Sequence, residues 1–213
     1  MNRNRFWMVT AALAVLFTNG VFFGGAMSFA HAQTQPISEP FFFDKPAVTQ
    51  HQFDLFQNFL KPKKGQLGSY YTGMDPTNVN RVANIKRAVD KIDNVVIQPG
   101  GKFSYNDTVG NANLPEDGWL TAGVIMNGAL SEGYGGGICQ VSSTLFNAVD
   151  QAGLTVVERH SHSLPTKYVP AGRDATVAYG TLDFVFSNSF DYPVKIKAKV
   201  YDDSYVLVRI LKA

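Results

Sequence analysis

The sequence predicts an α+β domain in which two helices pack on a largely antiparallel sheet. Two stretches, at about 76–93 and 139–152, repeat apolar residues at helical spacing. The last third of the chain contains three strand-like segments separated by turns, which is typical of an antiparallel meander. Between the two helices, Asn127-Gly128 separates two short apolar runs and therefore predicts a β-hairpin.

Within this domain we expect the following order of elements. Asp75 suits an N-cap before a proline at the first helical position, and Gly153 suits the residue that ends the second helix. In sequence, the expected elements are a strand at 69–72, a helix to about 93, strands at 95–97 and 103–105, a loop at 106–118, hairpin strands at 122–126 and 129–131, the helix at 139–152, and strands at 155–159, 175–186, 194–201 and 205–211.

Residues 1–32 have the pattern of an export segment. Arg3 and Arg5 precede a mostly apolar stretch at 6–29, and Ala30-His31-Ala32 provides a small-x-small pattern for cleavage before Gln33. The alternative is an uncleaved membrane anchor, because the apolar stretch is long enough to span a bilayer. In both cases we expect the folded part outside the cytoplasm, in the periplasm or cell wall, with membrane contact only through this segment.

Residues 33–66 form a predicted linker and residues 67–213 a single domain. The linker contains four prolines among polar residues, an aromatic group at 41–43 and a possible short helix near 53–60. The remainder is about one domain in length and can bury a core without disulfides.

The charge and cysteine content exclude several classes of protein. Without the first 32 residues, seventeen lysines and arginines balance seventeen aspartates and glutamates. Nothing therefore suggests a nucleic-acid partner, which would require a concentrated basic face. A single cysteine cannot form an intrachain disulfide, so an exported chain either buries this thiol, pairs it with another chain or uses it.

That cysteine, Cys139, follows a glycine-rich loop and lies in the first turn of the predicted second helix. Gly133, Gly135, Gly136 and Gly137 allow another molecule to approach the backbone closely. A helix N-terminus stabilises a thiolate, which is the nucleophilic form of cysteine, and its free N–H groups can receive an oxyanion. The alternative is a small, buried, apolar cysteine.

A cysteine nucleophile needs a base, and histidine is the usual partner. His51 lies in the predicted linker, which leaves His160 and His162 as candidates. Both lie on one face if this segment is a strand, and the sequence does not choose between them. Two other interpretations remain open, namely a zinc site with Asp174 or Asp183 and a pair of histidines without a chemical role. We expect neither a metal nor a cofactor.

Arg173 and Asp174 are candidates for substrate binding. Arg173 could hold a substrate carboxylate in a bidentate pair, and Asp174 could orient a histidine or pair with Arg173. The alternative is a structural salt bridge at a turn.

Several motifs together resemble the VanW family. They are Phe103-Ser104-Tyr105-Asn106, the run from Gly135 to Thr144, the run from Glu158 to Ser163, and Gly172 to Val177 with Tyr179-Gly180. The resemblance covers residues 69–196. The family takes its name from a glycopeptide-resistance cluster, and its domain is associated with L,D-transpeptidation of peptidoglycan through the motif cysteine, which is Cys139 here.

The residue pattern and the resemblance agree on acyl transfer through a thioester on Cys139, and the resemblance implies peptidoglycan stem peptides as the substrate. From the residues themselves we expect His160 or His162 as the base. The candidates for substrate contact are Gly135, Gly136, Gly137, Gln140, Ser142, Arg173 and Asp174. Two alternatives remain, a wall peptidase or amidase that uses the same cysteine, and a non-catalytic domain that binds peptidoglycan or a glycopeptide.

Overall fold

The computed structural model describes residues 50–126 and 128–213. The predicted export segment and the aromatic group at 41–43 lie outside these residues. The elements are α1 (Gln50–Leu60), β1 (Gln66–Gly73), α2 (Val79–Ile92), β2 (Val96–Ile97), β3 (Lys102–Ser104), α3 (Tyr105–Val109), the 3-10 helix η1 (Pro115–Asp117), β4 (Thr121–Met126), β5 (Ala129–Tyr134), α4 (Ile138–Ala152), β6 (Thr155–Glu158), β7 (Val185–Ser187), β8 (Val194–Tyr201) and β9 (Tyr205–Lys212).

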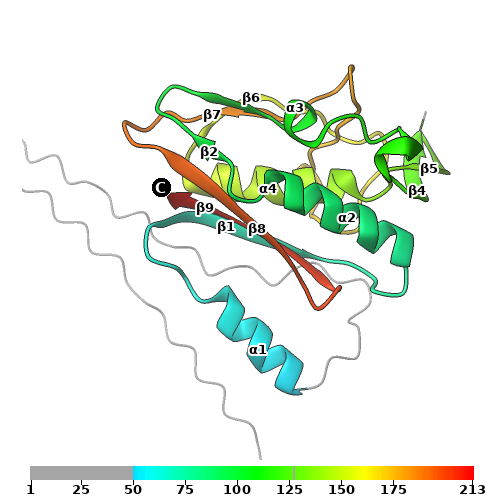
Figure 1. The fold of residues 1–213 in the computed structure, drawn as a ribbon, viewed down its shortest axis with the longest axis horizontal. Helices are drawn as coiled ribbons and strands as arrows, with labels where there is room; N and C mark the ends of the chain where they lie inside the picture. Colours follow the sequence, from blue (N-terminus) through cyan, green and yellow to red (C-terminus); the bar gives the residue numbers. More distant parts are fainter. Residues whose placement is uncertain (1–49, 127) are drawn as a thin grey trace, which may run out of the picture. The chain divides into compact units, whose positions relative to one another are not determined.

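The α+β class is confirmed, and all the strand pairs are antiparallel. A four-stranded sheet in the order β1-β9-β8-β2 lies against α2 and α4, and a three-stranded sheet in the order β3-β7-β6 covers the helices from the other side (Figure 1). The main core fills the space between these layers, because Val206, Val208 and Ile210 of β9 join residues of α2, α4 and β7 in one buried cluster.

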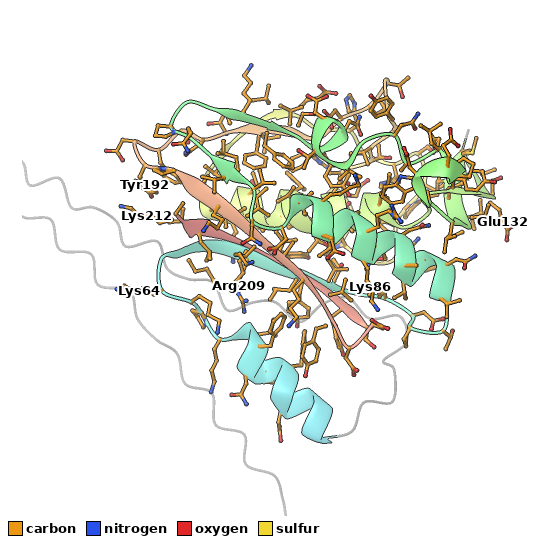
Figure 2. The ribbon with its side chains drawn as sticks, in the orientation of Figure 1. Lys64, Lys86, Glu132, Tyr192, Arg209 and Lys212 are labelled. Atoms are coloured by element: carbon orange, nitrogen blue, oxygen red, sulfur yellow. The ribbon has the colours of Figure 1, made fainter. Side chains whose placement is uncertain are left out.

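The opposite face of the four-stranded sheet is covered by α1. Phe56 and Leu60 pack on Tyr71, Tyr205 and Leu207 in a second buried cluster. Figure 2 shows Arg209 of β9 between the sheet and α1, where its guanidinium donates to the carbonyl of Phe59. The folded unit therefore includes residues that we expected in the linker. Among the residues described, no helix is long and apolar enough to cross a bilayer.

Helix α4 begins and ends where the sequence predicts, and it lies unusually close to β1. The helix ends at Gly153, whose φ of 74° is left-handed. At Gly68 of β1, an added Cβ would lie 2.3 Å from the carbonyl oxygen of Ala148 and 2.6 Å from the amide nitrogen of Ala152. Glycine at this position lets the helix backbone approach the strand.

The start of α2 differs from the prediction. The helix begins at Val79, and the side chain of Asn78 caps it by accepting from the amide of Arg81 at 3.2 Å. Asp75 instead accepts from the amide and hydroxyl of Thr77 at 2.9 and 2.7 Å. Asp75-Pro76 therefore forms a turn before the helix, which is the other structure that this dipeptide favours.

Two further segments differ from the prediction. The expected loop at 106–118 contains α3 and η1, and the expected strand at 175–186 is mostly irregular, with only β7 at its end. The irregular segment satisfies its backbone through side chains of α4, since Ser143 Oγ accepts from the amide of Ala175 at 2.8 Å and Asn147 donates to the carbonyl of Arg173 at 2.7 Å. The hairpin is confirmed, with Met126 paired to Ala129.

Candidate active site

The glycine loop before α4 is tightly packed as well as open to a cavity. Gly137 is the N-cap residue with a φ of 116°, and an added Cβ would lie 2.9 Å from Ile85 Cγ1. At Gly136 an added Cβ would lie 2.8 Å from the carbonyl oxygen of Gly123. Asn84 of α2 holds the loop by donating to the carbonyl of Gly136 at 3.0 Å. The glycines therefore fix the start of α4 against α2 and β4.

Cys139 is the second residue of α4 and is partly exposed. It lines a cavity of about 570 Å³, whose wall also includes Gly135, Gly136, Gly137 and His162. The thiol donates to the carbonyl of Val177 at 3.5 Å. The cysteine thus lies at a helix start, beside a space large enough for a short peptide.

His162 is held beside this thiol by Asp174. Its Nδ1 lies 2.7 Å from Asp174 Oδ2, and its backbone amide donates to the same oxygen at 2.6 Å. Because the carboxylate accepts from Nδ1, the geometry assigns the proton of the neutral ring to Nδ1 and leaves Nε2 as the basic nitrogen. The ring and the Cys139 thiol line the same cavity, and His162 acts to lower the pKa of that thiol. The three side chains are arranged as nucleophile, base and orienting carboxylate.

Asp174 is itself positioned by Arg159 and by α4. Arg159 Nε donates to the backbone carbonyl of Asp174 at 2.6 Å, and its Nη2 lies 3.5 Å from Asp174 Oδ1. On the other side, Ser142 and Ser143 bind the backbone of Ala175. The helix that presents the cysteine therefore also fixes the carboxylate behind the histidine.

These contacts shift the pKa values of the three groups. Burial raises the pKa of the Cys139 thiol, but interactions with His162 and with the Val177 backbone outweigh burial, and the pKa lies below its ordinary value. Burial lowers the pKa of His162, but Cys139 and Asp174 raise it above its ordinary value. Burial raises the pKa of Asp174, but hydrogen bonds from His162 bring it below its ordinary value. Together the shifts favour a thiolate beside an imidazolium.

His160 has a different environment. Its Nε2 lies 2.9 Å from Glu158 Oε1 in a half-exposed pair, and it does not line the cavity. The geometry therefore selects His162 as the candidate base. The two histidines have separate carboxylate partners, and the described part of the chain brings together no group of three histidine, cysteine, aspartate or glutamate side chains suited to a metal ion.

The other predicted site residues have mixed positions. Gln140 lines the cavity but is buried, and its amide donates to the carbonyl of Gly73 at 2.8 Å. Ser142 faces Ala175 and lies outside the cavity lining. Arg173 also lies outside it, because its guanidinium donates to Asn147 at 2.7 Å and pairs with Asp150 at 2.9 Å. Asp174 acts on His162, so its position suits orientation of the base and does not suit substrate contact.

Several cavity residues were missed by sequence reasoning, and three of them are polar side chains near the cysteine and the histidine. Arg81 comes from α2, Tyr105 from α3 and Tyr168 from the loop after His162. The hydroxyl of Tyr168 lies 3.3 Å from His162 Nε2, and that of Tyr105 donates to the carbonyl of Ile138 at 3.0 Å. Burial raises the pKa of both tyrosines well above its ordinary value, so both remain protonated donors. Two indications were available in the sequence: Tyr168 is close to His162, and Tyr105 belongs to the Phe103-Ser104-Tyr105-Asn106 motif.

Fold and site together define an α+β domain that presents a cysteine and a histidine at one cavity, with an aspartate bonded to the histidine. The chain belongs to the family of VanW like proteins, whose family model matches residues 80–211. The family that the sequence motifs resemble is thereby confirmed.

Two curated relatives are similar to this chain. It is 49% identical over 142 residues to the uncharacterized protein YoaR of Bacillus subtilis (strain 168), a match that covers 67% of this chain and 46% of YoaR. It is 30% identical over 148 residues to the vancomycin B-type resistance protein VanW of Enterococcus faecalis (strain ATCC 700802 / V583), which covers 66% of this chain and 53% of that protein. The chain thus spans about half the length of these relatives. No solved structure matches it.

Proposed function

We propose that this chain is an exported cell-wall protein that performs L,D-transpeptidase-like acyl transfer on peptidoglycan stem peptides. The observation that carries the proposal is the arrangement of Cys139 and His162 at a peptide-sized cavity, with Asp174 bonded to the ring of His162. The name of one relative, a vancomycin B-type resistance protein, supports a role connected with the wall.

In the first half of the reaction, His162 Nε2 takes the thiol proton, and the Cys139 thiolate attacks the amide carbonyl that follows the third residue of the stem peptide. A tetrahedral intermediate forms. The imidazolium of His162 then returns the proton to the amide nitrogen, the C–N bond breaks, and the terminal D-amino acid leaves. The product is a thioester on Cys139, and Asp174 stabilises the imidazolium throughout.

In the second half, an amine from a neighbouring stem attacks the thioester. His162 accepts a proton from this amine, the C–S bond breaks, and the thiol is restored as the new amide forms. The thioester supplies the driving force, so the reaction requires no nucleotide. If water attacks in place of the amine, the same site acts as a carboxypeptidase.

Product analysis tests this proposal. The purified chain is incubated with a tetrapeptide stem and an amine-bearing acceptor stem, and the products are identified by mass spectrometry. We expect release of the terminal D-amino acid and a cross-linked product, and neither with Cys139→Ala. Internal cleavage fragments without cross-links would indicate the peptidase or amidase alternative. Binding that leaves the peptide intact and is unaffected by Cys139→Ser would indicate the non-catalytic alternative.

A further inference from the structure

The cavity beside Cys139 is cationic. Of the described residues that line it, Arg81 and Lys167 carry a permanent charge, and none is an aspartate or a glutamate. Glu132 of β5 is exposed and points outward from the hairpin (Figure 2), and Asp174 is engaged behind His162. The field in the cavity therefore favours an anionic group on the ligand.

Arg81 is held at the start of α4 by a relay of hydrogen bonds. Its Nη2 donates to Gln140 Oε1 at 2.9 Å, and the Gln140 amide donates to Thr72 Oγ1 at 3.0 Å. Its Cγ also packs against the loop, since a Cβ added at Gly137 would lie 3.1 Å from it. The guanidinium is therefore fixed in place by the residue that follows Cys139, and the side chains of Arg81 and Cys139 line the same cavity.

The anchored guanidinium lacks a carboxylate partner within the described part of the chain, where none of the ion pairs includes Arg81. Burial lowers its pKa, and the neighbouring Tyr168 and Cys139 only partly oppose this effect. A partly buried charge without a counterion is unfavourable, and a ligand carboxylate would remove that cost. Lys167, by contrast, is exposed to solvent.

We infer that Arg81 determines specificity by binding the free carboxylate of the substrate's terminal residue, the residue that leaves when Cys139 attacks. This inference rests on the proposed acyl transfer. In such a peptide only the amide nitrogen and one α-carbon separate the terminal carboxylate from the attacked carbonyl, so a cation beside the thiol is within its reach. The planar guanidinium fork suits a carboxylate. The site therefore acts at the last peptide bond and disfavours amidated or extended chains.

The first test uses two alkylating reagents that differ in charge. Iodoacetate and iodoacetamide attack the same Cys139 thiolate, so the ratio of their rates is independent of how much thiolate is present. We expect the ratio of iodoacetate to iodoacetamide rates to fall roughly tenfold in Arg81→Met, in line with the loss of one charge-assisted hydrogen bond. Arg87→Met is the matched control, because Arg87 lies on the same helix outside the cavity lining.

Circular dichroism checks that the variants are folded. If Arg81→Met unfolds, Arg81→Gln serves as the neutral variant, and Arg81→Lys, which keeps the charge, should keep most of the ratio. An unchanged ratio in a folded neutral variant, or an equal fall in Arg87→Met, would overturn the inference.

The second test measures peptide binding by calorimetry in the Cys139→Ala background, where no thioester forms. Amidation of the terminal carboxylate of a tetrapeptide should weaken binding roughly ten- to hundredfold when Arg81 is present, and should have little effect in Arg81→Met. Two peptides, one with lysine and one with a carboxylate-bearing residue at the third position, show whether binding depends on the terminal carboxylate or on a side-chain carboxylate. Dependence on the side-chain carboxylate in place of the terminal one would overturn the inference.

Both tests are independent of turnover, so their outcome is separable from that of the proposed function. If both succeed and no acyl transfer occurs, the carboxylate site stands and the transferase proposal fails. If acyl transfer occurs on free-acid and amidated peptides equally, the transferase stands and the role of Arg81 is wrong.

Discussion

The reactivity of Cys139 depends on His162, because the two side chains stabilise each other as a thiolate and an imidazolium. In the wild type the pKa of the thiol lies below its ordinary value because His162 stabilises the thiolate against the opposing effect of burial. Removing the imidazole leaves burial, which acts in the opposite direction. In His162→Ala the pH midpoint of iodoacetamide alkylation should therefore move upward, and in His160→Ala it should stay close to that of the wild type. Equal midpoints in all three proteins would refute the pairing.

Asp174 should matter through His162 alone. In Asp174→Asn the amide no longer stabilises the imidazolium, so the pKa of His162 should fall and acylation by a tetrapeptide should slow roughly a hundredfold or more. The matched control is Asp150→Asn, which removes the partner of Arg173 at the far end of α4. Acylation rates and an NMR titration of the imidazole provide the measurements. An unchanged His162 titration would show that the carboxylate is only structural.

The candidate site was predictable where its residues carry a local pattern. Cys139 was visible because a glycine loop and a helix start adjoin it, and the histidine pair was visible through elimination. The choice between His160 and His162 depends on which of the two histidines forms a hydrogen bond with Asp174. That is decided by contacts between residues far apart in the sequence. Arg81 carried no local indication, because α2 reaches the cavity only through tertiary packing.

At the scale of elements, α4 is a helix with a buried polar face. Ser142, Ser143 and Asn147 are buried and bind the backbone of residues 173–175, a segment that makes no ladder with a neighbouring strand there. The apolar residues at 175–186 predicted a strand, but most of this segment is irregular in the structure, because its backbone bonds to side chains of α4. Alternation of apolar residues does not reveal that the backbone partner is a helix side chain.

The close contact between α4 and β1 provides a test of this packing. Gly68→Ala would place a Cβ 2.3 Å from the carbonyl oxygen of Ala148, so the helix must move or strain. We expect the free energy of unfolding to fall by roughly 1–3 kcal/mol. Gly123→Ala in β4 is the matched control, because an added Cβ there meets nothing within 4 Å. Urea denaturation measures both, and equal stabilities would contradict the predicted clash.

At the scale of the whole molecule, the two faces of the four-stranded sheet have different roles. One face packs on α2 and α4, which build the site, and the other packs on α1. The class, most strands and the short helix near 53–60 were predictable from the sequence. The packing of this helix on the sheet was not, because it depends on aromatic side chains of β1 and β9 that are far away in the sequence.

This separation predicts that stability and reactivity can be changed independently. Phe56 is buried against Tyr71, Tyr201 and Tyr205, so Phe56→Ala should lower the free energy of unfolding by about 3 kcal/mol. Because α1 covers the face opposite the site, the alkylation rate of Cys139 should remain within about twofold of the wild type. Gln57→Ala, on the exposed side of α1, is the control. A large loss of reactivity in Phe56→Ala would show that the two faces are coupled.

The most direct test of the central claim is the intact mass of the protein after mixing with a tetrapeptide stem. The account predicts an adduct equal in mass to the tetrapeptide minus the free terminal amino acid that leaves, attached to Cys139 as a thioester and released by hydroxylamine. Cys139→Ala should show no adduct, and His162→Ala should form it far more slowly. Turnover of the peptide by Cys139→Ala at the wild-type rate, or the persistent absence of an adduct and of any product from the folded wild type, would contradict the account.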